Sequence, residues 1–137
     1  MNEKQLAVLV NRFYAKVRED EVLGPVFNGA IADWPEHLKK LTDFWSSVML
    51  TTGRYKGQPM VAHMKHKATI DPSMFGRWLD LWRETARETL SKPAAAAIIM
   101  KAERIAESLQ LGLFFKLQQR RSRRLKEKSD VHSDCRP

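Results

Sequence analysis

The chain has 137 residues, 43% of them hydrophobic, which suits one domain with a substantial core. No apolar run approaches the roughly 18 residues of a membrane span, and the N-terminus lacks the apolar segment of a signal peptide, so we expect a cytoplasmic protein. The single cysteine, Cys135, excludes an internal disulfide and a metal site built from several thiolates.

The positive charge of the chain is concentrated at its C-terminal end. The formal net charge is +8, and residues 116–137 hold eight Lys or Arg against three Asp or Glu, a net of +5, which leaves +3 for residues 1–115. We therefore divide the chain into a folded domain at 1–117 and a basic tail at 118–137. The tail has few apolar residues and dense charge, so we expect it to be disordered.

The first predicted helix is amphipathic and begins after Asn2, a good N-cap residue. Its apolar residues recur at intervals of three and four, as one buried helix face requires. They are Leu6, Leu9, Val10, Phe13, Tyr14 and Val17. Gly24 and Pro25 end this pattern, and we expect a loop that carries Phe27 and extends to about Asp33.

The second predicted helix begins at Asp33, with Trp34 and Pro35 in its first turn. Its apolar stripe consists of Leu38, Leu41, Phe44, Trp45, Val48 and Met49. His37 precedes Leu41 by four residues and therefore shares that face. Residues 51–57, which include two glycines, break the helix, and Pro59 suits the first position of a short helix that carries His63.

Two further helices complete an all-α pattern, and we find no convincing strand. Asp71 and Pro72 predict the start of a helix whose apolar side includes Phe75, Trp78, Leu79 and Trp82. A second break at residues 91–93 precedes the last helix, from about Ala94 to about Leu117. Two helices that meet at an angle could then direct His37 and His63 into one pocket from opposite sides.

None of the candidate chemical residues is decisive alone. A single histidine on an apolar helix face is more often a hydrogen-bonded core residue than a ligand, and this applies to His37 and His63. His63 and His66 could form half of a zinc site, but no matching acid or cysteine completes it. The buried phenol of Tyr14 needs a partner, either a backbone carbonyl or a bound ligand. Phosphate-binding loops, nucleophile elbows and paired catalytic carboxylates are absent from the sequence.

Taken in order, short motifs resemble the group III truncated haemoglobins, which are globins with a two-over-two helical sandwich around a haem. The resemblance covers residues 3–117, and the order and spacing of the motifs are more specific than any one of them. The motifs are FY at 13–14, DEVLGPVF at 20–27, WPEH at 34–37, FW at 44–45, YKGQPMVAH at 55–63 and FGRWLDLW at 75–82. The basic tail is not part of this pattern.

The resemblance implies a haem b cofactor and a role for each matched residue. His63 is expected to be the proximal iron ligand, and Tyr14 the distal phenol. His37, Leu41 and Trp78 are expected on the distal side, and Phe27 is expected to pack on the haem. Such a site would bind dioxygen, carbon monoxide, nitric oxide or peroxide.

The function that follows from the resemblance is ligand chemistry or sensing more than bulk oxygen transport. Polar hydrogens on Tyr14, Trp78 and His37 would stabilise the charge that dioxygen acquires on ferrous haem and slow its release. Nitric oxide dioxygenation and peroxide reduction are both compatible with this, as is a reversible sensor. The chain has no room for a flavin domain, so turnover would need electrons from an external reductase.

A different class of function depends on the tail. A helical module without haem could bind nucleic acid or an anionic surface through the basic residues after position 117. The folded part contains no nucleic-acid recognition motif, and charged tails are often only solvated. We therefore expect neither a nucleic-acid nor a membrane partner for the folded domain.

Overall fold

A computed structural model describes residues 1–115, and the prediction of a disordered tail lies outside this part of the chain. The helices are α1 (Glu3–Glu19), α2 (Leu23–Ala30), α3 (Trp34–Leu50), α4 (Pro59–Met64), α5 (Pro72–Thr89) and α6 (Lys92–Gln110). A 3-10 turn, η1 (Lys67–Thr69), and a π-helical turn, η2 (Leu111–Phe115), complete the described chain. Residues 1–115 contain no strand, and the all-α prediction is confirmed.

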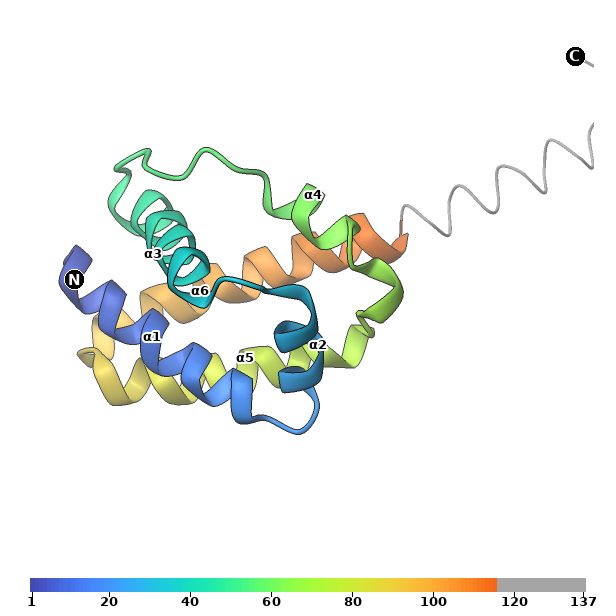
Figure 1. The fold of residues 1–137 in the computed structure, drawn as a ribbon. Coiled ribbons are helices and arrows are strands. Elements are labelled where there is room, and N and C mark those ends of the chain that lie inside the picture. Colours follow the sequence, from blue (N-terminus) through green and yellow to red (C-terminus); the bar gives the residue numbers. More distant parts are fainter. Residues whose placement is uncertain (116–137) are drawn as a thin grey trace, which may run out of the picture.

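The helices form two packed pairs. Helix α1 packs against α3, α5 packs against α6, and the pairs meet where α1 crosses α5 (Figure 1). The short helix α4 packs on η2 and α6. This is the two-over-two arrangement that the sequence predicts.

Polar caps begin the helices at the predicted places. The side chains of Asn2, Asp33 and Asp71 accept hydrogen bonds from backbone N–H groups in the first turns of α1, α3 and α5. Such caps each contribute about 0.5–2 kcal/mol. Helix α6 begins at Lys92, two residues before the predicted start, because Ser91 accepts a hydrogen bond from the N–H of Ala94.

The predicted loop around Phe27 is wrong, because Leu23–Ala30 form helix α2. The carboxylate of Asp20 accepts hydrogen bonds from the N–H groups of Val22 and Leu23, at 3.0 and 2.9 Å, and so nucleates a new helix. Pro25 lies in its first turn, where the N–H that proline lacks has no intrahelical partner in any case. Gly24 and Pro25 therefore separate two helices without preventing the second.

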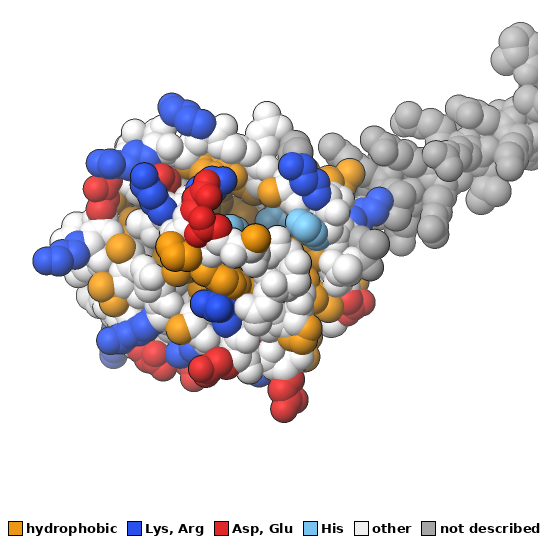
Figure 2. Space-filling view, in the orientation of Figure 1, with side chains coloured by type: hydrophobic (Ala, Val, Ile, Leu, Met, Phe, Trp, Pro, Cys, Tyr) orange, Lys and Arg blue, Asp and Glu red, His pale blue; other side chains and the backbone are white. Residues whose placement is uncertain are grey.

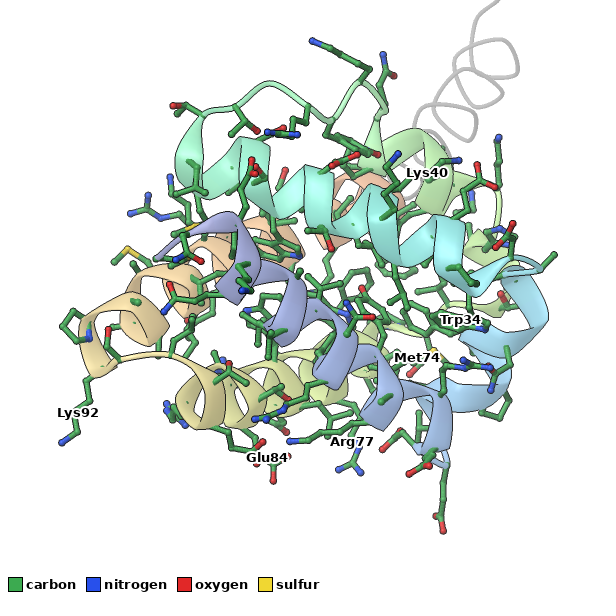
Figure 3. The ribbon with its side chains drawn as sticks, turned by 60° about the vertical axis from the view of Figure 1, so that its left-hand side comes forward. Trp34, Lys40, Met74, Arg77, Glu84 and Lys92 are labelled. Carbon is green, nitrogen blue, oxygen red and sulfur yellow. The ribbon has the colours of Figure 1, made fainter. Side chains whose placement is uncertain are left out.

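The core is continuous through α1, α3, α5 and α6. Leu6, Leu9 and Phe13 of α1 are fully buried, as is Trp82 of α5. Charged side chains such as Arg77, Glu84 and Lys92 point away from the helices (Figure 3). In the described part of the chain, no helix combines the length and apolarity needed to cross a membrane.

Gly24 allows α2 to approach α1 closely, and this contact generates a stability prediction. A Cβ atom at Gly24 would lie 2.7 Å from the carbonyl oxygen of Arg18, which is backbone and cannot move aside. We expect Gly24→Ala to lower the free energy of unfolding by about 1–3 kcal/mol. Urea unfolding followed by circular dichroism measures this change.

Gly29, in the same helix, is the matched control. A Cβ atom there meets nothing within 4 Å, so Gly29→Ala should be neutral or stabilise the protein by up to about 1 kcal/mol. Equal effects of the two substitutions would show that close packing at Gly24 does not matter.

Candidate functional site

Tyr14 is the centre of an aromatic cluster where α1, α2 and α3 meet. Its side chain is buried, and its ring contacts Phe27 of α2 at 5.7 Å and His37 of α3 at 6.1 Å between centroids. Trp34 also contacts the Tyr14 ring, at 6.1 Å, and carries the guanidinium of Arg18 on its outer face at 4.5 Å. The structure thus brings together three of the predicted residues, from three helices.

Trp78 of α5 reaches the same phenol. Burial raises the pKa of Tyr14 well above its ordinary value, and a side-chain hydrogen bond with Trp78 offsets a smaller part of that shift. An indole N–H can only donate, so the Tyr14 oxygen is the acceptor. The phenol therefore stays protonated, and its own hydrogen remains available to a ligand.

Helix α3 presents His37 and Leu41 on one face. Burial lowers the pKa of His37, and the positive charge of Lys40 lowers it further, so the imidazole is neutral near pH 7. The side chains of Leu38, Leu41 and Phe44 pack on the core but remain half-buried, whereas the apolar stripe of α1 is wholly buried. An apolar helix face that remains partly exposed to solvent can form one wall of a pocket for an apolar ligand.

His63 lies on α4, remote in sequence from this cluster. Its Nδ1 is 2.7 Å from the carbonyl oxygen of Pro59. A carbonyl only accepts, so Nδ1 carries the hydrogen and Nε2 keeps a free lone pair, which is the form that binds a metal. His66 is exposed, whereas His63 is half-buried and contacts Phe75 of α5 at 6.4 Å.

Helix α5 connects the His63 side with the Tyr14 side. Phe75 contacts His63, and Trp78, three residues later, contacts Phe13, whose ring packs on Tyr14. These two positions on one helix differ by only about 4.5 Å along its axis. Leu79 and Ile105 pack against both hydrophobic clusters of the protein, the main one around α1 and a smaller one near α4. The two groups of predicted residues are therefore neighbours along α5.

The surface is hollowed on the face seen in Figure 2. Hydrophobic side chains lie within the hollow, and histidine side chains lie beside it (Figure 2). Acidic and basic side chains also lie at the edge of this apolar surface (Figure 2). An apolar hollow with charged groups at its rim is compatible with a small-molecule site.

Two contacts of the site were not singled out from the sequence. Phe75 was placed only in an apolar stripe, although it lies against His63. Trp34 was identified only as a first-turn residue, although it packs on Tyr14. The spacing of Phe75 and Trp78 on one helix face was the available signal for the first contact. The second depends on how α3 meets α1, which no local pattern shows.

Comparisons with known proteins show the family and the fold of the chain. A sequence model of the bacterial-like globins matches residues 2–110. The chain is 34% identical over 118 residues to the group 3 truncated haemoglobin ctb of Campylobacter jejuni, covering 83% of this chain and 92% of that protein. A crystal structure of the group III truncated haemoglobin from Campylobacter jejuni matches with a TM-score of 0.77, at 34% identity and the same coverage of each chain.

The buried phenol of Tyr14 generates a prediction for the dependence of stability on pH. The pKa of Tyr14 in the folded protein is above that in the unfolded chain. The stability that the protonated phenol contributes is therefore fully present below about pH 10 and is lost as the pH rises further. Above pH 10 we expect the unfolding free energy of the wild type to fall more steeply than that of Tyr14→Phe. The difference should approach about 1.4 kcal/mol per pH unit.

Urea unfolding at pH 8, 10 and 11 measures both slopes. Other groups that titrate in this range are common to the two proteins and cancel in the comparison. Parallel curves for the two proteins would mean that the phenol is not buried as described.

Proposed function

The chain belongs to the bacterial-like globin family as a group III truncated haemoglobin, and we propose that it binds diatomic ligands on a His63-ligated haem b to carry out ligand chemistry. The observation that supports this most is the buried, protonated phenol of Tyr14, in one aromatic cluster with Phe27 and His37. Burying a phenol costs free energy unless its hydroxyl finds a partner, and a bound ligand would be such a partner.

The donor set of the site fits a haem. Nδ1 of His63 is held by a backbone carbonyl, which is the usual second contact of an iron-ligating histidine and leaves Nε2 as the nitrogen that would bind the iron. The half-buried faces of Leu41 and Phe27 would supply apolar walls. The sole cysteine, Cys135, is far from His63 in the sequence and makes no haem-attachment motif, which favours non-covalent haem b.

When bound, haem would supply an iron that takes up dioxygen and shifts electron density onto it. The chain's own contribution is to place donors where that charge develops. The hydroxyl of Tyr14 is the first donor, and Trp78 fixes its orientation or donates directly. His37 is neutral because of its lowered pKa, so it can add one N–H without adding a charge.

Such hydrogen-bond donors favour reactions of the bound dioxygen over oxygen transport. A hydrogen bond to a charged acceptor contributes roughly 1.5–3 kcal/mol, so each donor would slow dioxygen release about ten- to a hundredfold. A slowly releasing globin is a poor carrier but gives nitric oxide or peroxide time to react. Electrons for turnover would come from a separate reductase, and the cytoplasm would provide both ligand and reductant.

The assignment of His63 is tested by removing each histidine of the pair. We expect His63→Ala to abolish the Soret band of the purified protein or reduce it severely, because no other side chain on α4 offers an equivalent lone pair. His66→Ala is the matched control and should retain haem, because His66 is exposed three residues away. The reverse pattern would mean that His66, in the turn after α4, binds the iron instead.

The distal pair is tested by oxygen release. Tyr14→Phe keeps the ring and removes only the hydroxyl, so we expect dioxygen to dissociate roughly ten- to a hundredfold faster. Carbon monoxide takes less charge from iron and should respond less. Stopped-flow measurement on the wild type, Tyr14→Phe, Trp78→Phe and the double variant gives the coupling between the two side chains.

The effects should be non-additive, because donors that share one acceptor form a network. Equal rates for all four proteins would rule out the polar distal pocket. Additive effects would show instead that the two side chains act on the ligand independently.

A further inference from the structure

Three tryptophans form a continuous stack through the protein. Trp78 and Trp82, one turn apart on α5, have parallel rings with centroids 5.4 Å apart and an interplanar angle of 4°. Trp82 in turn stacks on Trp45 of α3, at 4.6 Å and 21°. Three of the four tryptophans of the chain are therefore in face-to-face contact.

The stack has one end at the candidate site and continues toward the surface at the other. Trp78 is half-buried and contacts Phe13, whose ring packs on Tyr14. Trp82 and Trp45, which follow, are only 0% and 1% exposed. Phe44 then contacts both Trp45 and Tyr55, at 5.3 and 5.2 Å between ring centroids. Tyr55 is half-buried in the segment between α3 and α4.

Trp82 carries an unusual feature for a core residue. Its Nε1 is buried and has no hydrogen-bond partner among the described residues. Leaving a buried N–H unpaired costs free energy, and such groups are uncommon enough to require an explanation. An indole that loses one electron becomes a strong acid. With no acceptor beside it, Trp82 would keep its proton, and its oxidation would remain readily reversible.

We propose that Trp78, Trp82, Trp45 and Tyr55 form a relay that carries electrons from the protein surface to the haem pocket when the site meets peroxide. The inference rests on the proposed haem function. Indole and phenol side chains are among the protein groups most easily oxidised by one electron, and rings in contact exchange electrons quickly. Phe44 is too difficult to oxidise to carry a radical itself. Its ring fills the space between Trp45 and Tyr55, and the electron passes through it by tunnelling.

The electron balance is complete with one external donor. Hydrogen peroxide takes two electrons and two protons and yields two molecules of water. When bound, haem would supply the group that reacts with peroxide, and the two electrons would reach its pocket through the side chains of the relay, one at a time. Each electron leaves Tyr55, whose phenolic proton passes to water, and the tyrosyl radical regains an electron and a proton from a small reductant such as ascorbate.

The test is the site at which the protein itself is oxidised. Haem-loaded full-length protein is treated with hydrogen peroxide and a nitrone spin trap without ascorbate, and peptides are analysed by mass spectrometry. We expect adducts at Tyr55 in the wild type, although it is remote from the haem. In Trp82→Phe, which keeps a packed ring, labelling of Tyr55 should fall to the level without peroxide and move toward Trp78 or Tyr14.

Two further variants make the result specific. Trp34→Phe removes an indole that also contacts Tyr14 but lies outside the stack, and it should leave Tyr55 labelling unchanged. Tyr55→Phe should convert the radical seen by electron paramagnetic resonance from tyrosyl to tryptophanyl. If Trp82→Phe loses haem, Trp45→Phe interrupts the same relay and provides the comparison.

The Soret band of each sample shows whether haem is bound. It therefore distinguishes failure of the haem function from failure of the relay alone. A wild type without a Soret band would overturn both the haem function and the relay. A normal Soret band with unlabelled Tyr55, or with labelling that persists in the variants that interrupt the stack, would overturn the relay alone.

Discussion

The contact between Phe13 of α1 and the two indoles of α5 holds the rest of the structure in position. The ring of Phe13 is fully buried and meets Trp78 and Trp82 edge-on, at 5.2 and 4.8 Å between centroids. Edge-to-face pairs contribute about 0.5–1.5 kcal/mol beyond their buried area. Because Tyr14 is the next residue, the packing that fixes the crossing of α1 and α5 also directs the phenol toward Trp78.

The two sides of the site are positioned by different forces. The Tyr14 side is built from aromatic packing among long helices, which resists displacement. The His63 side depends on a six-residue helix, α4, and on one hydrogen bond from the imidazole to its own backbone at Pro59. A helix this short has little intrinsic stability and depends on its packing against α6 and η2. Haem ligation by His63 would therefore stabilise α4 as well as the cofactor.

The aromatic residues of α5 serve several roles at once. Trp78 contacts Phe13 beside Tyr14, Phe75 packs on His63, and Trp82 is fully buried in the core. Their spacing follows from the helical repeat, which places residues three or four apart on one face. A single amphipathic helix thereby links the surroundings of His63, the surroundings of Tyr14 and the proposed electron relay.

The sequence by itself determined every described α-helix except α2, and it supplied the candidate residues of the site. The all-α class, the caps at Asn2, Asp33 and Asp71, and the short helix that begins at Pro59 all follow from local chemistry that acts within one turn. Helix α2 was missed, although the Asp20 carboxylate that accepts the N–H of Leu23 is local. Only the tertiary structure showed what holds that carboxylate in place, because its ion pair with Arg77 joins residues 57 apart. The contacts of His63 with Phe75 and of Trp45 with Trp82 likewise join separate helices, and a local pattern carries no information about which faces meet.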